Sequence, residues 1–262
     1  MNVLQARVVF RDRPLADVLD LALRFCAVQG LRYAKVALAT TVPLFGITLA
    51  VAYAGGPVWG WLTAIPLAIA AQLPFTVLAS RLVFQDDVTV KNVLAIALKE
   101  APRVIFVRTI TLALVVASSI FVIVPFVLAA IFLFLGEVML LERAPLAAAM
   151  TRARRVSVSS VGDALLAIFA LALIPAAAIL LAEVGGRGVM SGLLQLRPPA
   201  ALWDEGWSVL AFAGLFAIAP YAATARFFVY LNIRTRTEGW DIQTRFAAIA
   251  ARASREERAE AA

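Results

Sequence analysis

Six apolar stretches divide the chain, and each is close to the length that crosses a lipid bilayer. A spanning helix needs about 20 mostly apolar residues, because the hydrocarbon core is about 30 Å thick. The stretches of this kind are 34–54, 58–79, 104–123, 125–141, 163–184 and 207–230. A helix that is apolar on every face has to be surrounded by lipid or protein, so these stretches restrict the chain to a membrane-embedded helical fold.

The composition agrees with this restriction. Charged residues make up 16% of the 262 residues, whereas a soluble domain carries about 25%. We therefore predict an all-α, polytopic six-helix transmembrane bundle with short amphipathic cytoplasmic helices. Its predicted parts are an amphipathic cytoplasmic helix in 1–32, the six-span membrane domain in 33–230 and a basic cytoplasmic tail in 231–262.

Turn signals join the stretches into hairpins. The segment 55–57, Gly-Gly-Pro, connects the first two. The residues 109–141 contain no basic residue and would form a straight helix of roughly 50 Å, so we expect a turn at 124–125, Val-Pro. A re-entrant second half over 125–141 is the alternative. The segment 185–206, rich in Gly and Pro, is predicted to be a loop.

The basic residues indicate which ends of the predicted helices face the cytoplasm. Of the 24 Lys and Arg residues, all but Arg187 and Arg197 fall in the termini, in the segments after the second and fourth stretches, or in the adjoining ends of stretches. Because loops rich in Lys and Arg stay inside, both termini are predicted to be cytoplasmic. Four tryptophans fall at the opposite boundary, as in an interfacial aromatic belt: Trp59, Trp61, Trp203 and Trp207.

Three cytoplasmic segments have the apolar periodicity of amphipathic helices, namely 14–29, 89–101 and 145–156. The last one carries candidate contacts for lipid head groups, anionic ones at the cytoplasmic leaflet in particular: Arg152, Arg154 and Arg155. The alternative is that these helices pack against the ends of the spans and bind no lipid. Because the basic residues gather at the membrane boundary, we predict membrane lipids, and not nucleic acid, as the partner.

Three motifs occur in order along the chain: "RDRPLADVLDLALRF" before the first stretch, "LLERAPLAAAMTRARR" after the fourth and "YLNIRTRTEGWDI" after the last. Together they resemble the membrane domain of the glycerophosphoryl diester phosphodiesterase type, found fused to some bacterial enzymes and in many stand-alone bacterial membrane proteins. The residues on motif positions are Glu142, Arg143, Tyr230, Arg234, Arg236, Glu238, Gly239 and Asp241. Asn232 departs from the resemblance, because an aspartate is expected there. Within the tail, Glu238 is predicted to pair with Arg234, and Gly239 to end the last helix.

The resemblance implies a protein of the bacterial cytoplasmic membrane, and it does not imply phosphodiesterase activity. In the fused enzymes, catalysis belongs to a separate soluble barrel domain that uses histidines and metal-binding carboxylates. The present chain has no histidine and one cysteine, Cys26, and its six spans leave no residues for such a domain. We therefore expect it to have no catalytic residues, no cofactor and no metal site.

Charged residues inside the apolar stretches are candidates for a buried ion pair. Glu137 lies five residues before Glu142, about 7 Å deeper along a helix, and Arg108 and Arg226 are expected at a similar depth. An ionisable group in lipid is costly, so it usually faces the bundle and pairs. We predict that Glu137 is neutralised by Arg108 or Arg226. The simpler interpretation of this pair is an anchor without a transport role.

Two functions suit such a chain. The first is a non-catalytic scaffold or accessory subunit in a membrane-lipid or envelope process, with a protein partner or a second copy of the chain. The second is a transporter or channel for a small or lipid-like solute. The spans carry few central polar residues, namely Gln72, Ser118 and Ser119, which favours the first function. A continuous polar cavity that reached the middle of the membrane would favour the second.

Overall fold

A computed structural model of the chain describes residues 13–84, 88–142, 145–158 and 161–238, and no β-strand occurs within these four ranges. The α-helices are α1 (Leu15–Val28), α2 (Gly30–Ala39), α3 (Thr41–Gly55), α4 (Pro57–Phe84), α5 (Val90–Ala117), α6 (Val124–Phe132), α7 (Leu135–Glu142), α8 (Leu146–Val158), α9 (Val161–Leu180), α10 (Gly186–Gly188), α11 (Leu202–Glu205), α12 (Val209–Ala217) and α13 (Ala219–Glu238). A 3₁₀ helix, η2 (Ser118–Ile120), and two π-helices, η3 (Leu181–Gly185) and η4 (Val189–Leu193), complete the set.

Six helical runs are long and apolar enough to span a membrane, which confirms the predicted all-α transmembrane bundle. They are Gly30–Gly55, Pro57–Phe84, Val90–Ile120, Val124–Glu142, Val161–Leu193 and Val209–Arg236. The shortest has 19 residues. At 1.5 Å per residue a run of this length measures about 28 Å, close to the thickness of the hydrocarbon core.

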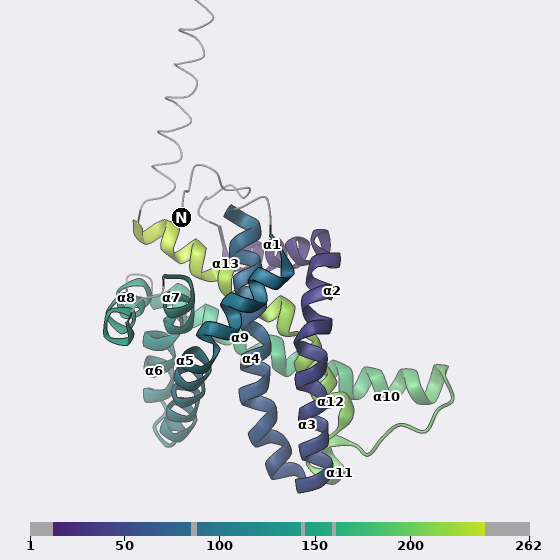
Figure 1. Cartoon of the computed structure of the whole chain (residues 1–262). Coiled ribbons are helices and arrows are strands. Elements are labelled where there is room, and N and C mark those ends of the chain that lie inside the picture. The colour runs from purple at the N-terminus through teal and green to yellow at the C-terminus, as the bar shows by residue number, and fades with distance from the viewer. Residues whose placement is uncertain (1–12, 85–87, 143–144, 159–160, 239–262) are drawn as a thin grey trace, which may run out of the picture.

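The first four runs form two hairpins, with turns where the sequence predicts them. α3 ends at Gly55 and α4 begins at Pro57, while α6 begins at Val124 with Pro125 in its first turn. A proline is tolerated in a first turn, because its missing N–H would have no helical partner there. In Figure 1 the α3–α4 and α5–α6 hairpins point the same way, with their turns at the same end of the molecule.

One predicted boundary is wrong, because a helix continues through it. The segment 89–101 is not a separate interfacial helix; most of it forms the first part of α5, which continues through Pro102. The last helix continues beyond the apolar stretch that ends at Tyr230, buries Leu231 and Ile233, and runs to Glu238, the residue before its predicted end at Gly239. Tertiary packing keeps both segments helical although charged residues interrupt their apolar pattern.

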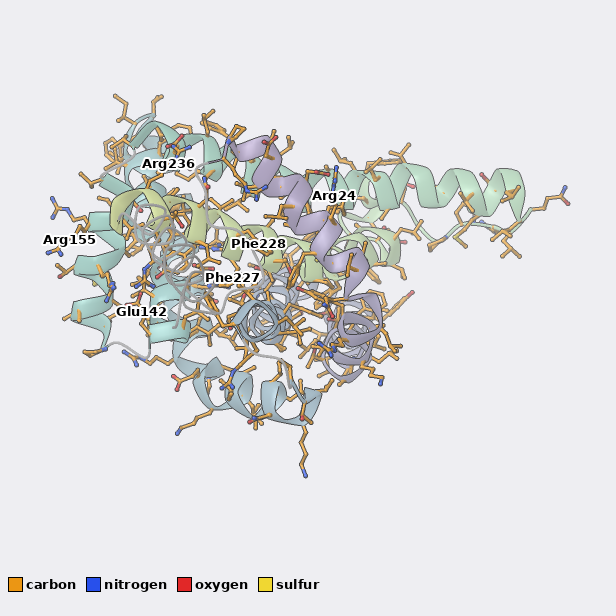
Figure 2. The ribbon with its side chains drawn as sticks, turned by 90° about the horizontal axis from the view of Figure 1, so that it is seen from above. Arg24, Glu142, Arg155, Phe227, Phe228 and Arg236 are labelled. Atoms are coloured by element: carbon orange, nitrogen blue, oxygen red, sulfur yellow. The ribbon has the colours of Figure 1, made fainter. Side chains whose placement is uncertain are left out.

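The predicted loop 185–206 is wrong in its first part. The helix that begins as α9 continues through η3, α10 and η4 to Leu193. Its glycines predict a break, but a glycine costs only about 1 kcal/mol in a helix interior, and the run stays helical as α- and π-helical turns. Figures 1 and 2 show this run lying crosswise to the α3–α4 hairpin, with its far end extending away from the other helices.

α12 crosses α9 at very short range. A Cβ atom at Gly214 would lie only 2.4 Å from the carbonyl oxygen of Ala178 and 2.7 Å from the Cβ of Ala182. Small residues allow helix backbones to approach closely in membranes, where van der Waals packing drives helix association. The crossing at Gly214 therefore anchors the long α9 run against the last span.

α1 packs as a docking helix against α13 (Figure 2). Its Val18 and Ala22 are buried, and the ring of Phe25 meets the ring of Phe228 edge-on, with centroids 5.2 Å apart. The apolar face of this amphipathic helix is thus covered by protein. For the segment 14–29, this packing favours the docking interpretation over the lipid-binding one.

Aromatic residues gather at the turn between α3 and α4, where α11 also lies (Figure 1). Trp61 donates its Nε1–H to the carbonyl oxygen of Gly206 at 2.8 Å, and Trp207 is buried beside it. Trp59 and Trp203 are largely exposed. The four tryptophans predicted for the interfacial belt therefore lie at one end of the bundle, and two of them also hold α11 to the hairpin.

Candidate functional site

Part of the predicted motif set lies outside the described residues. Arg143, Gly239 and Asp241 belong to segments that the structure does not describe, as do residues 1–12 of the predicted N-terminal part. Glu238 is the last described residue of α13, but its side chain is not described, so its predicted pairing with Arg234 stays a prediction.

Glu137 is a carboxylate buried inside the bundle, in the first turn of α7. The fourth span is interrupted at residues 133–134, between α6 and α7. The residue has no exposed area. A carboxylate in this position is stable only if neighbouring cations and donors compensate for the loss of water.

Two arginines from other spans provide this compensation. Arg108 of α5 donates its Nη2–H to Oε1 of Glu137, and Nε of Arg226 on α13 lies 2.8 Å from the same oxygen. Nη2 of Arg226 also donates to the carbonyl oxygen of Leu133, which the helix break leaves without an intrahelical partner. The structure thus brings the three predicted residues together, with both arginines, and not just one, on the carboxylate.

The absence of a side chain at Gly136 makes room for Arg108. A Cβ atom at this position would lie 2.2 Å from Nε of Arg108. Any larger residue would push the guanidinium away from Glu137, so Gly136 is part of the ion-pair site. The sequence does not reveal this role, because a glycine in an apolar stretch carries no signal of what it contacts.

The charges of this cluster do not balance. Arginine stays protonated in proteins, so two guanidinium groups and one carboxylate leave one positive charge in excess. Within the described part of the chain, Nε and Nη1 of Arg108 and Oε2 of Glu137 are buried without a hydrogen-bond partner. The Arg226 side chain is 25% exposed, against 7% for Arg108, so Arg226 presents the accessible guanidinium.

A cavity of about 320 Å³ lies beside the two arginines. Its walls come from α4, α5, α6, α7, α9 and α13 and are mostly apolar; the polar lining residues are Gln72, Arg108, Thr111 and Arg226. Glu137 is not a lining residue, so the cavity meets the positive side of the cluster. On α5 the lining extends from Val107 to Val115, about 12 Å along the helix, which is less than half of a bilayer core.

Glu142 is the centre of a second ion cluster, at the end of α7. Its Oε1 accepts a hydrogen bond from the Tyr230 hydroxyl at 2.7 Å and lies 3.0 Å from Nη1 of Arg234, while its Oε2 lies 2.9 Å from Nη1 of Arg152. The guanidinium of Arg234 also covers the Tyr230 ring at 5.8 Å, within the range of a cation–π interaction. Residues of two motifs that are far apart in the sequence therefore meet at one point.

The other predicted arginines lie away from this point. Arg236 pairs with Asp163, at the start of α9. Arg154 and Arg155 are exposed on α8, and Figure 2 shows Arg155 at the outer side of that helix. Of the three predicted lipid contacts, Arg152 thus joins an ion pair, and the other two face outward.

Asn232 holds the backbone at the start of α1. Its Oδ1 accepts from the N–H of Arg13 at 3.2 Å, and its Nδ2 donates to the carbonyl oxygen of Arg13 at 3.0 Å. An amide can accept and donate at once, whereas an ionised aspartate can only accept. This role gives a physical reason for an asparagine at the position where the family resemblance leads one to expect an aspartate.

A second fully buried carboxylate, Glu183 in η3, is not among the predicted site residues. Its Oε1 accepts from the N–H of Leu202 at 3.0 Å and lies 3.5 Å from Nη1 of Arg187, and its Oε2 accepts from the Ser208 hydroxyl. The residue has no exposed area. The signal that could have found it is the one that found Glu137, a lone carboxylate inside an apolar stretch.

Comparisons of the chain with protein-family models, with curated proteins and with solved structures find no match. In the described ranges, no three His, Cys, Asp or Glu side chains are grouped as the ligands of a metal ion would be. The features that bear on function are therefore the three carboxylate clusters and the cavity.

Proposed function

We propose that this chain is a non-catalytic membrane protein that binds anionic lipid near the end of the bundle where α1 meets α13. In this proposal it acts as a scaffold or accessory subunit in a membrane-lipid or envelope process. The observation that carries the proposal is the excess positive charge of the cluster formed by Arg108, Glu137 and Arg226.

The physical reason is the cost of an unbalanced charge among apolar side chains. An ionisable group at membrane depth is stable when it is paired, and here two guanidinium groups share one carboxylate. An anionic lipid head group supplies both the missing charge and additional acceptor oxygens. Arg154 and Arg155 on α8 add exposed positive charge, worth about 1 kcal/mol for each residue close to an anionic leaflet.

The shape of the cavity supports a bound lipid over the alternative of a transporter or channel. A conduit for a solute needs a polar path that crosses the bundle. The cavity instead covers about 12 Å of α5, and both of its charged lining residues, Arg108 and Arg226, belong to one cluster. Ser118, which the sequence offers as a central polar residue, bonds to the carbonyl oxygen of Val115 in its own helix.

The lipid composition of the purified protein tests the binding. Protein extracted with a mild uncharged detergent keeps tightly bound lipids, which mass spectrometry identifies. We expect anionic lipids to be enriched over the bulk membrane, and less so in an Arg154→Gln/Arg155→Gln variant. Arg197→Gln, an exposed arginine of the segment after η4, is the matched control. A wild-type protein that carries the bulk lipid composition would contradict the proposal.

The same preparation tests the scaffold role. A protein partner in fixed stoichiometry, or a second copy of the chain, is the expected companion in the mildest detergent. A chain that elutes alone under these conditions, with its lipids retained, would contradict the scaffold role but leave lipid binding intact.

The proposed location is the bacterial cytoplasmic membrane, with both termini in the cytoplasm. It is supported by the motif resemblance, by the distribution of basic residues, and by the bond between Arg13 and Asn232, which joins the two described ends of the chain. A cysteine introduced at Arg197 should react with a membrane-impermeant maleimide in intact cells, and one at Val28, which is 81% exposed, should not. Cys26 adds little background, because burial raises the pKa of its thiol. Equal labelling of both sites would contradict this orientation.

A further inference from the structure

We propose that the cavity beside Arg108 and Arg226 is the binding site of one single-chain anionic amphiphile, such as a fatty acid or an alkyl phosphate. The head group contacts the two arginines, and the alkyl chain lies between α5 and α9. This inference deepens the proposed function, since it names the site and the class of lipid.

The charge of the ligand follows from which groups line the cavity. Arg108 and Arg226 both line it, whereas Glu137, their shared carboxylate, does not. A ligand in the cavity therefore meets two guanidinium groups without their counter-ion. One negative charge on the ligand balances the one positive charge that the cluster has in excess.

The hydrogen-bonding groups point to a head group with several oxygens. The side chain of Arg108 is more than nine-tenths buried, and its Nη1 has no hydrogen-bond partner among the described residues. Carboxylates and phosphates present acceptor oxygens in the spacing that a guanidinium group matches. Thr111, one turn from Arg108 on α5, also lines the cavity, but its hydroxyl donates to Val107 of its own helix.

The size and the walls of the cavity point to a single alkyl chain. About 320 Å³ lies at the small end of the range for ligand pockets, roughly 300–1,000 Å³. Beyond the two arginines the lining is mostly apolar, with side chains such as Leu112, Phe132 and Leu171. The cavity thus has two arginines in one part of its lining and mostly apolar walls elsewhere. This distribution matches a ligand with one charged head group and one alkyl chain.

The cavity is open at its side, between α5 and α9. Leu112 of α5 is 39% exposed, and Ala172 of α9 is also exposed, although both line the cavity. In a bilayer this opening would face lipid. An amphiphile could then enter sideways from the membrane, and the chain would not have to cross the charged end of the bundle.

Binding of defined probes tests the site in the full-length protein, purified in dodecyl maltoside. Lauric acid and dodecyl phosphate have twelve carbons, as the tail of this uncharged detergent does, and end in a carboxylate or a phosphate. We expect each to bind saturably at one site, as an added mass in native mass spectrometry and a rise in the unfolding temperature. Zwitterionic dodecylphosphocholine should not bind. The two anionic probes show whether the site prefers a carboxylate or a phosphate.

Two kinds of variant connect the binding to the cavity. Ala172→Phe fills the opening and should weaken binding of the anionic probes about tenfold or more, whereas Ala176→Phe, an exposed alanine one turn further along α9 that does not line the cavity, should leave it unchanged. Arg226→Gln should weaken binding by a similar factor, and Arg226→Lys should restore part of it. Because Arg226→Gln also removes a packing contact, the Ala172→Phe and Ala176→Phe pair decides the result if the arginine variant does not fold.

The outcomes separate this inference from the proposed function. If the protein enriches anionic lipids but Ala172→Phe binds both probes as the wild type does, the cavity site is wrong and the proposed function stands. If only two-chain lipids are retained and neither probe binds, the single-chain assignment is wrong. If anionic lipids are not enriched and neither probe binds, both proposals fall.

Discussion

Glu137 and Glu183 are both fully buried carboxylates within apolar stretches, yet their partners differ. Both oxygens of Glu183 are satisfied: Ser208 and Leu202 donate neutral hydrogen bonds, and Arg187 on the next helical turn balances the charge at 3.5 Å. Glu137 instead receives two arginines on one oxygen, and its other oxygen has no partner among the described residues.

This difference separates a structural role from a binding role. The partners of Glu183 come from α11 and the start of α12, so the carboxylate ties the segment after η4 back to the bundle. The fold therefore provides a partner for each carboxylate oxygen of Glu183. In the Glu137 cluster, two donor atoms of Arg108 have no acceptor among the described residues, and one positive charge is in excess. The cavity adjoins the two arginines of this cluster. A buried polar cluster that the fold leaves incomplete is a better candidate for binding than one that the fold completes.

The largest effect is expected from Glu137→Gln. The change leaves two guanidinium groups in the bundle without a counter-charge, and breaking a buried ion pair in this way costs about 3–5 kcal/mol. Thermal unfolding in uncharged detergent should show a large loss, and added dodecyl phosphate should restore part of it. An unchanged unfolding temperature would mean that the ion pair does not contribute to stability.

Ser208→Ala should give the next largest effect, because the hydroxyl has two roles. It donates to Glu183, and as the N-cap of α12 it accepts from the N–H of Ala211 at 3.0 Å. Losing the cap and leaving a buried carboxylate oxygen without its donor should together cost about 1–3 kcal/mol. The same thermal measurement applies, with Ser191→Ala on η4 as the control, since that exposed hydroxyl bonds only within its own helix. Equal effects of the two variants would contradict the role given to Ser208.

Arg108→Gln sharpens the comparison, because it removes the excess charge and leaves a balanced pair of Arg226 and Glu137. We expect a loss of about 1–2 kcal/mol from the missing charged hydrogen bond, well below the effect of Glu137→Gln. Stabilisation by added dodecyl phosphate should disappear in this variant. Should the phosphate stabilise it as much as the wild type, the excess charge is not what attracts the anion.

Glu183→Gln should have the smallest effect of the four. Glutamine keeps one acceptor oxygen for Leu202 N–H, and the rotating hydroxyl of Ser208 can accept from the new amide. The expected loss is about 1 kcal/mol, measured in the same unfolding experiment as Glu137→Gln. If both glutamine variants lose the same stability, the distinction between a completed and an incomplete cluster does not hold.

Most of the architecture was predictable from the sequence, and the errors have a common cause. The six runs and the turns at 55–57 and near Pro125 follow from local apolar length and turn residues. The predicted loop over 185–206 is wrong in its first part, because the α9 run stays helical through its glycines, and 89–101 belongs mostly to α5 instead of forming a separate helix. In both places, residues that predict a break do not end the helix.

For the candidate site, the sequence indicated the ionisable residues but not their arrangement. A charge inside an apolar stretch stands out, so Arg108, Glu137 and Arg226 were found. Gly136 was missed, because its role is to leave space for a side chain from another helix. The cavity was missed for the same reason, since its walls come from helices that are distant along the chain.

The sequence by itself determined that this chain forms apolar helices of membrane length, with its basic residues concentrated in alternate connections. Length and hydropathy are properties of neighbouring residues, so they can be recognised without a fold. Only the tertiary structure decided that Arg108 reaches Glu137 across 29 residues and that Tyr230 reaches Glu142 across 88. The physical reason is that a buried charge is stabilised by whatever donors the packing brings within about 3 Å, and packing joins residues without regard to their order in the chain.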